Sequence, residues 1–339
     1  MRAALWYKAK DLRVEEIPTP VAPPGMALVK IDRTGICGTD LEEYLLGPVI
    51  IPAGMSPIIL GHEFVATIVS DSTGTFSAGT MVIPDGVIGC GTCYQCQRHE
   101  EGRCPELNVI GLQSNGGLAE FMITDPKRCV PVPAGVSADV AVFAEPTAVA
   151  VRAVNKIPNV PGTTVAVLGS GTVGILCAQV VRAFGAQKLI VYEPNPVRQE
   201  VARKLGFEVL NPLVEKEISM YKDFDSVLEC SGVAGSTKTS LKILRSGGTA
   251  VLVGFRPGDE SFDLLEFILS EKHLVGTAAH MWDVDVSAAV GLLANKIIET
   301  GPLLTDVISL ADVATKGFDR LISDKNAFKI IVNPQIISN

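Results

Sequence analysis

One glycine-rich segment limits most narrowly what this chain of 339 residues can fold into. The apolar run from Val165 to Leu168 predicts a buried strand, and a helical pattern and a second apolar run follow it. The turn between the first strand and the helix has the order G-x-G-x-x-G, with Gly169, Gly171 and Gly174. The first glycine allows a tight turn, the second a close approach of phosphate, and the third close packing of helix on strand.

The same alternation of strand and helix continues through the second half of the chain. Apolar runs such as FDSVLECSG and GGTAVLVG alternate with helical patterns such as STKTSLKILRSG. This order predicts a doubly wound parallel sheet of Rossmann type over 148–300, hence an α/β fold. Residues 1–147 instead hold short β-prone runs broken by Pro and Gly, which predicts a mostly β domain. The β-prone run near the end suggests that 301–339 rejoins this first domain.

The glycine-rich turn is a candidate dinucleotide site. The helix that begins at Thr172 and Val173 would offer free N–H groups to a pyrophosphate. Glu193 ends the second strand, where a carboxylate accepts hydrogen bonds from the adenosine ribose and repels a 2′-phosphate. We therefore favour NAD over NADP. The alternatives are that Glu193 only begins a loop and that Arg198 pairs with a phosphate.

Four of the eight cysteines lie within sixteen residues, GCGTCYQCQRHEEGRC, 89–104. The four are Cys90, Cys93, Cys96 and Cys104. Gaps of two residues let neighbouring thiolates converge on one tetrahedral ion, whereas a disulfide needs no such rhythm. A closed set of four thiolates leaves no position for substrate, so we predict a structural zinc site; a cluster that holds no metal is the alternative.

Charge and hydropathy exclude some partners. The formal net charge of −8 argues against nucleic acid, because phosphate binding needs a positive surface. No apolar run reaches the roughly 20 residues that cross a bilayer. The charged start, MRAALWYKAKDLRVEE, does not read as a signal peptide. We expect an intracellular, cytoplasmic protein without a membrane partner.

Three further residues suggest a reactive metal site. They are Cys37 in GICGTD, His62 in LGHEF and Glu145 in FAEPTAV. Each alone has an ordinary structural explanation, since a single histidine or cysteine is more often part of the core. Together they offer one thiolate, one imidazole and one carboxylate, and three protein ligands with an open position are what catalytic zinc requires.

The order of these motifs resembles the zinc-dependent medium-chain dehydrogenase/reductase family over nearly the whole chain. The resemblance implies a GroES-like catalytic domain and a Rossmann NAD domain, with one structural and one catalytic zinc. It matches Cys37, His62 and Glu145 to the catalytic zinc ligands. Glutamate at the third position is similar to the polyol and butanediol branch. Glu63 then matches a carboxylate that supports or exchanges with those ligands.

The resemblance also implies a reaction, the reversible oxidation of a secondary alcohol to a ketone with hydride transfer to the cofactor. Bound zinc would lower the pKa of the alcohol, and Thr39 is positioned to take its proton. Glu42 stands where the branch usually has histidine. It is either the outlet of this proton relay or a solvated surface carboxylate.

The substrate is expected to be a small secondary alcohol or vicinal diol, or its ketone. GTDLEEYLLGPVIIP, 38–52, is most similar to (R,R)-2,3-butanediol dehydrogenases, and the apolar character of Leu45 to Leu60 disfavours a long polyol. Candidate wall residues are Tyr44, Ile51 and His280, each also explicable as core. Sorbitol-type and L-threonine-type dehydrogenases are the enzyme alternatives, and a non-catalytic NAD-binding structural or sensor protein is the alternative from another class. By resemblance we expect a homodimer or homotetramer, formed through the edge of the Rossmann sheet.

Overall fold

The computed structural model of the protein describes residues 1–256 and 258–337. Its contacts divide the chain into two compact units. Unit 1 comprises Met1–Ala148, His280–Asn295 and Thr300–Asn339, and unit 2 comprises Val149–Ala279 and Lys296–Glu299. The expected second domain, 148–300, differs from this division at 280–295. That segment groups with unit 1 because its side chains pack there, as the contact of Met281 with Gly102 illustrates.

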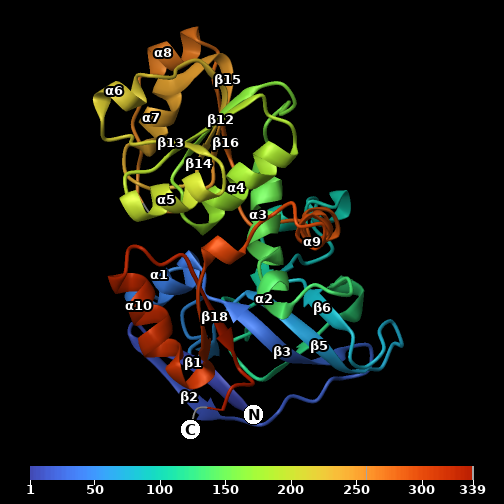
Figure 1. Cartoon of the computed structure of the whole chain (residues 1–339). Coiled ribbons are helices and arrows are strands. Elements are labelled where there is room, and N and C mark those ends of the chain that lie inside the picture. Colours follow the sequence, from blue (N-terminus) through green and yellow to red (C-terminus); the bar gives the residue numbers. More distant parts are fainter. Residues whose placement is uncertain (257, 338–339) are drawn as a thin grey trace. The chain divides into compact units, whose positions relative to one another are not determined.

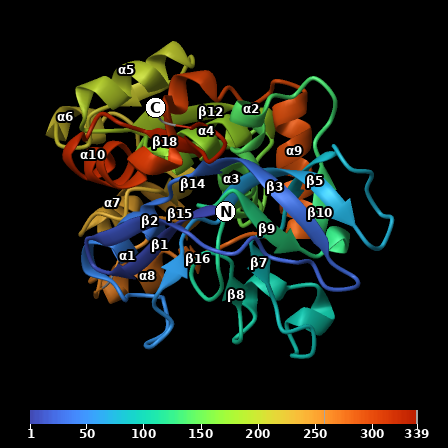
Figure 2. The ribbon, with the colours of Figure 1, turned by 90° about the horizontal axis from the view of Figure 1, so that it is seen from below.

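Unit 1 is built from mostly antiparallel sheets, with β17 and β18 paired in parallel. One has the order β2-β1-β4, a second β10-β6-β5-β3-β18-β17 with β9 added on β3, and a third β7-β8 (Figure 2). The strands are β1 (Arg2–Lys8), β2 (Asp11–Glu16), β3 (Ala27–Gly35), β4 (Ile58–Ile59), β5 (Glu63–Asp71), β6 (Met81–Pro84), β7 (Val87–Ile88), β8 (Asn108–Val109), β9 (Phe121–Thr124), β10 (Cys129–Pro131), β17 (Leu304–Ser309) and β18 (Lys329–Asn333). Inward side chains alternate along the first part of β3, as expected of a half-buried strand.

The C-terminal segment lies within the large sheet of unit 1. β18 pairs antiparallel with β3, with Ile331 opposite Gly35 and Val332 opposite Thr34, and β17 extends the sheet beyond it (Figure 1). This pairing brings the end of the chain to the strand that leads into Cys37.

The helices of unit 1 are short. They are α1 (Gly38–Leu46), α2 (Ala138–Ala141), α9 (Ser287–Ala294) and α10 (Arg320–Ser323), with α3 (Ala144–Val154) running from unit 1 into unit 2. Brief 3-10 and π-helical turns complete the unit: η1 (Cys96–Arg98), η2 (Glu101–Arg103), η3 (Pro126–Arg128), η4 (Trp282–Val286), η5 (Gly301–Leu303), η6 (Leu310–Asp312) and η7 (Val313–Asp319).

Unit 2 is a parallel sheet with the order β13-β12-β11-β14-β15-β16. Its strands are β11 (Thr164–Leu168), β12 (Lys188–Tyr192), β13 (Glu208–Leu210), β14 (Phe224–Glu229), β15 (Leu244–Leu252) and β16 (His273–Gly276). Its helices are α4 (Thr172–Ala183), α5 (Pro196–Lys204), α6 (Glu215–Ile218), α7 (Ser236–Ile243) and α8 (Leu264–Leu269). The near-continuous burial of β11 is typical of a parallel strand covered on both faces. The predicted α/β fold of GroES-like and Rossmann domains is confirmed. Among the described residues, none belongs to a helix long and apolar enough to span a membrane.

Candidate active site and metal centres

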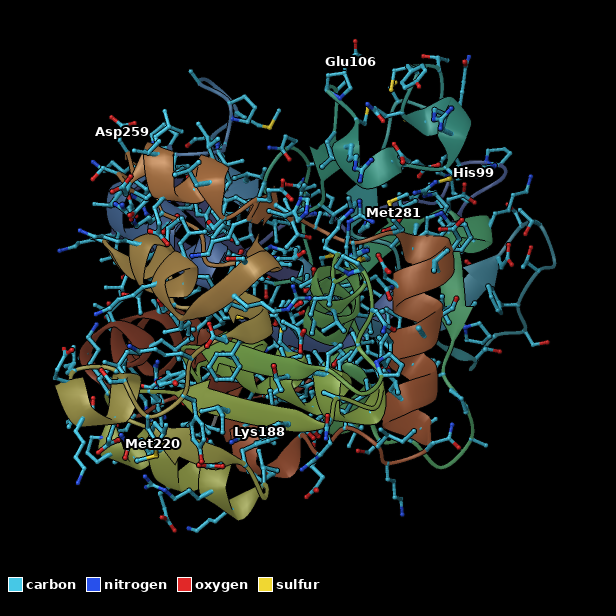
Figure 3. All side chains as sticks on the ribbon, turned by 90° about the horizontal axis from the view of Figure 1, so that it is seen from above. His99, Glu106, Lys188, Met220, Asp259 and Met281 are labelled. Carbon is cyan, nitrogen blue, oxygen red and sulfur yellow. The ribbon has the colours of Figure 1, made fainter. Side chains whose placement is uncertain are left out.

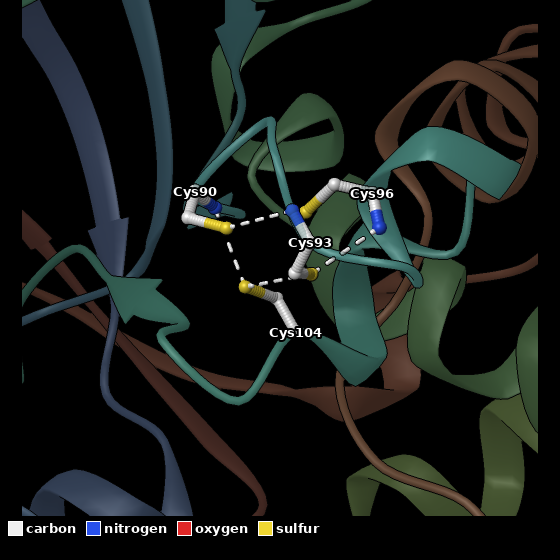
Figure 4. Close-up of side chains that lie close together, drawn as sticks. All are labelled: Cys90, Cys93, Cys96 and Cys104. Carbon is white, nitrogen blue, oxygen red and sulfur yellow. Dashed lines mark hydrogen bonds between the residues drawn. The ribbon is translucent and has the colours of Figure 1, made fainter.

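The four clustered cysteines converge in unit 1. Their sulfur atoms all lie within 4.8 Å of one another, and Cys93 Sγ is 3.8 Å from Cys104 Sγ (Figure 4). Backbone amides point at the same sulfurs: Cys90 N–H donates to Cys104 Sγ at 3.3 Å and Cys93 N–H to Cys90 Sγ at 3.4 Å. All eight cysteines of the chain are free thiols. The segment is therefore folded around a common centre without a disulfide.

The electrostatics of this group favour thiolates. Hydrogen bonds, the backbone amide of Thr92 foremost, lower the pKa of Cys90 to about 6. Burial instead raises the pKa of Cys96 to about 12. A divalent cation among the sulfurs would favour the deprotonated form of both. The donor set fits tetrahedral zinc, which four thiolates bind as a closed structural site.

A second group of donors surrounds Asp40, which is fully buried at the first turn of α1. Its Oδ2 accepts the Cys37 N–H at 2.9 Å and its Oδ1 accepts the Gly61 N–H at 3.3 Å. Oδ1 also lies 3.4 Å from His62 Nδ1, a distance and orientation short of a full hydrogen bond. Asp40 thus ties the loop of Cys37 to the loop of His62. The sequence analysis overlooked this residue, although its place three residues after Cys37 makes it a capping side chain of α1.

His62 is buried at the start of β5, in contact with Cys37. Burial lowers the pKa of His62, but the Asp40 carboxylate and the Cys37 sulfur outweigh burial and hold it well above its usual value. A histidine oriented by a carboxylate on one ring nitrogen is suited to ligate a metal through the other.

Glu145 lies near the start of α3 and faces His280. Its Oε1 is 3.6 Å from His280 Nε2, and the histidine side chain is 1% exposed. Burial raises the pKa of Glu145 to about 8 against the opposing effect of His62. Such a buried carboxyl group ionises readily only beside a cation. Among the described residues, the four cysteines are the one group whose ligand atoms meet within 4.8 Å. The ligand atoms of Cys37, His62 and Glu145 therefore do not all lie within that distance of one another.

Glu63 forms a buried ion pair with Lys329 of β18. Lys329 Nζ lies 2.7 Å and 2.6 Å from the two carboxylate oxygens and also donates to Ile36 O at 3.0 Å. Lys329 is 266 residues away from Glu63 in the sequence, so no local sequence pattern predicts this pairing. This pair places the carboxylate next to His62 with its charge compensated.

Thr39 and Glu42 lie on α1. The Thr39 hydroxyl is 3.9 Å from Cys37 Sγ. Glu42 is half-buried, and burial followed by the nearby Glu43 raises the pKa of its carboxyl group. The Glu42 side chain is thus less hydrated than a fully exposed surface carboxylate.

The three substrate-wall candidates are all buried. Tyr44 and Ile51 are 5% and 4% exposed and belong to the hydrophobic core of unit 1, where the Tyr44 ring packs on Phe318 and its hydroxyl donates to Asp319 at 3.1 Å. Both residues therefore have the packing role that was their alternative explanation. His280 belongs to unit 1 and lies opposite Glu145.

The glycine-rich turn of unit 2 has the geometry that its spacing predicts. Gly169 has φ +91°, and a Cβ there would lie 2.9 Å from Ser231; a Cβ on Gly174 would lie 2.0 Å from Gly169 O. A Cβ on Gly171 would meet only Arg198 Nη1, at 3.8 Å. The first and third glycines are therefore required by packing, and the second leaves space beside the start of α4 where a phosphate fits.

Glu193 is buried at the end of β12, beside this turn. Its Oε2 accepts hydrogen bonds from Ser170 N–H at 2.8 Å and Ser170 O–H at 3.1 Å, and its Oε1 accepts from Asn195 N–H at 2.8 Å. These bonds fix the carboxylate. Because each oxygen retains acceptor capacity, ribose hydroxyls can bind there as well.

Comparison with known proteins agrees with both halves of this architecture. Residues 23–134 match the alcohol dehydrogenase GroES-like domain and residues 172–295 match the zinc-binding dehydrogenase domain. The chain belongs to the zinc-dependent medium-chain dehydrogenase family.

Individual relatives differ in their named substrates. An (R,R)-butanediol dehydrogenase of Saccharomyces cerevisiae is 29% identical, with 98% of each chain covered. An L-threonine 3-dehydrogenase of Mesorhizobium japonicum is also 29% identical, again with 98% of each chain covered. The crystal structure of 2R,3R-butanediol dehydrogenase from Bacillus subtilis superposes with a TM-score of 0.91 at 26% identity, covering 98% of this chain and 99% of that one. The protein is an oxidoreductase of the zinc-dependent alcohol and polyol dehydrogenase type, which uses a nicotinamide cofactor.

Proposed function

We propose that the protein oxidises a small secondary alcohol or vicinal diol, of the 2,3-butanediol kind, to the ketone with NAD, at a zinc site formed by Cys37, His62 and Glu145. The observation that carries the proposal is the Asp40 carboxylate, which accepts the Cys37 amide hydrogen bond and lies 3.4 Å from His62 Nδ1. A thiolate and an imidazole held together in this way need only Glu145 to complete a three-ligand site.

In this proposal, side chains of the protein orient the substrate and move its hydroxyl proton. When bound, zinc supplies Lewis-acid polarisation that lowers the pKa of an alcohol. Thr39 accepts the hydroxyl proton and donates its own proton onward, while Glu42 is the outlet to solvent. A bound nicotinamide would supply the hydride acceptor for the substrate carbon. Asp40 and the Glu63–Lys329 pair keep the charged groups in place without touching substrate.

Each chain holds two zinc ions in this proposal, one at the four cysteines and one at Cys37, His62 and Glu145.

Cofactor preference rests on Glu193. A fixed carboxylate at the end of the second strand favours ribose hydroxyls and opposes a 2′-phosphate, so NAD should be used better than NADP.

The substrate class rests on resemblance and relatives. In the apolar run 45–60 only Ile51 and the residues 58–60 belong to the core, while Leu46, Val49 and Met55 are exposed. Butanediol dehydrogenases are among the similar sequences and among the similar structures, and both likenesses span nearly the whole chain. The L-threonine 3-dehydrogenase of equal identity is the specific reason to keep threonine as the second candidate.

A substrate panel tests the proposal. NADH formation is followed with (R,R)-2,3-butanediol, 2-butanol, sorbitol and L-threonine, with NADP in place of NAD as a parallel series. We expect the diol to have the highest kcat/KM. Equal turnover of 2-butanol would remove the diol from the proposal, and preference for sorbitol or threonine would replace it.

We also propose that the protein is a homo-oligomer through the Rossmann sheet edge. β16 is an edge strand, and the neighbouring α8 exposes four large apolar side chains, Leu264, Leu265, Ile268 and Leu269. Contiguous apolar exposure of this kind marks an association surface. Light scattering should give a dimer or tetramer that L265E/L269E converts to monomer; a monomeric wild-type protein would contradict this.

A further inference from the structure

The four-cysteine segment of unit 1 contacts the loop that carries His280. Gly102, in η2 between Cys96 and Cys104, donates its N–H to Met281 Sδ at 3.4 Å. A Cβ on Gly102 would lie 2.8 Å from His280 O, which leaves no space for any side chain. Figure 3 shows Met281 near the segment that carries His99. The backbone of the cysteine segment therefore packs directly on the backbone of residues 280 and 281.

A second contact joins the same two segments through Arg128. Its guanidinium bonds Glu101 of η2 at 2.5 Å and Asp85 at 2.5 Å, and it lies 5.3 Å from the ring centre of Trp282. Burial works against the charge of Arg128, but its hydrogen bond to Glu101 and the charge of Asp85 raise its pKa. The Arg128 guanidinium thus contacts both η2 and the start of η4.

The loop in turn reaches the third proposed zinc ligand. Met281 N–H donates to Asp285 at 2.8 Å, which braces the loop from its C-terminal side. His280, 1% exposed, then lies 3.6 Å from the Glu145 carboxylate. The buried imidazole therefore limits the space that this carboxylate can occupy.

We propose that the four-cysteine segment positions Glu145 for the catalytic metal, acting through Met281 and His280. This inference rests on the proposed zinc site. It gives the four-cysteine segment a second role, because the segment would orient a ligand of the catalytic metal as well as stabilise unit 1. His280 is accordingly a positioning residue, and Gly102 is the point at which the support is transmitted. Residues that orient metal ligands affect metal affinity by roughly 10–100-fold when they are changed.

The test measures metal affinity at the catalytic site. Protein folded with zinc is dialysed against a chelator until one zinc per chain remains at the four thiolates, and Co²⁺ is then titrated into the emptied site by its absorption. We expect G102A to retain its thiolate-bound zinc but to bind Co²⁺ roughly 10–100-fold more weakly. G291A, in α9 of the same unit, is the control, because a Cβ there meets no atom within 4 Å; it should bind as the wild type does.

A double-mutant cycle tests the path. If the segment acts through His280, H280A should weaken Co²⁺ binding, and G102A should have little further effect in the H280A background. Rescue by H280Q, which keeps a donor of similar reach, is expected to be partial. Full additivity of G102A and H280A would overturn the inference.

The remaining outcomes are also decisive. If G102A loses its thiolate-bound zinc, the M281L variant is used in its place, because this change removes only the sulfur acceptor. Unchanged Co²⁺ affinity in M281L would then overturn the inference. Unchanged affinity in G102A itself would do the same. A wild-type protein that binds no second metal would instead refute the proposed zinc site, and is distinguishable from both.

Discussion

Lys329 of the last strand compensates the buried charge of Glu63, the residue that follows His62. Both side chains are almost fully buried, and Nζ lies 2.6 Å from the nearer carboxylate oxygen. The pair connects the C-terminal return of the chain to the proposed metal site.

Replacing this lysine should destabilise unit 1 strongly. K329M leaves the Glu63 carboxylate buried without a cation, which typically costs about 3–5 kcal/mol of unfolding free energy. Urea unfolding measures the loss. K316M is the control, because Lys316 forms an exposed pair with Asp312 and should change stability by less than about 1 kcal/mol. A K329M loss as small as that of K316M would contradict this role.

The pH dependence of stability should report Asp85. Burial raises its pKa to about 6 although Arg128 opposes the shift. Because the folded-state value lies above the usual one near 4, the contribution of Asp85 to stability is fullest below pH 4 and is lost as pH rises through 6. Relative to D85N, the wild type should therefore lose up to about 3 kcal/mol between pH 4 and 7.5. Urea unfolding of both proteins over that range is the measurement. D283N, at an exposed aspartate, should run parallel to the wild type; a parallel D85N curve would refute the shift.

Cofactor preference should depend on Glu193. E193S removes the carboxylate that we propose binds the ribose, so kcat/KM with NAD should fall roughly 10–100-fold, as loss of a charged hydrogen bond implies. Activity with NADP should fall less or rise. Steady-state kinetics with both cofactors measure the change, and E200Q, at an exposed residue of α5, is the control. An unchanged NAD to NADP ratio in E193S would assign the preference elsewhere.

The third glycine of the turn should not tolerate a side chain. G174A places a Cβ 2.0 Å from Gly169 O, so the turn must move and NADH binding, measured by fluorescence, should weaken at least tenfold. G276A in the same unit adds a Cβ in open space and should bind NADH normally. Zinc content should be unchanged in both variants. Normal NADH binding by G174A would show that the turn lies outside the cofactor site.

Sequence reasoning succeeded where the determining pattern is local. The cysteine spacing and the glycine order each specify their own turn, so the thiolate cluster and the strand–turn–helix were predictable from a few residues. It failed where partners meet through tertiary pairing. His280 beside Glu145 and Lys329 beside Glu63 depend on segments far apart in the chain, and neither has a spacing that points to the other.

Hydrophobic patterning alone leaves the role of two residues open. Tyr44 and Ile51 belong to the core of unit 1, and apolar character by itself does not distinguish a core residue from the wall of a pocket. Asp40 was missed because a lone acidic residue in the first turn of a helix is common. Its meaning became visible only when Gly61 and His62 were found at its carboxylate.

The central claim is that Cys37, His62 and Glu145 hold a catalytic zinc separate from the thiolate-bound one. Metal analysis of purified wild type, C37S, H62A and E145Q, paired with their turnover of (R,R)-2,3-butanediol, tests it most directly, with C129A as a control at a buried cysteine outside both groups. The account predicts two zinc ions per chain in the wild type and in C129A. It predicts that the other three variants hold only the thiolate-bound zinc and are inactive. Retention of two zinc ions and of activity in C37S or H62A would contradict it.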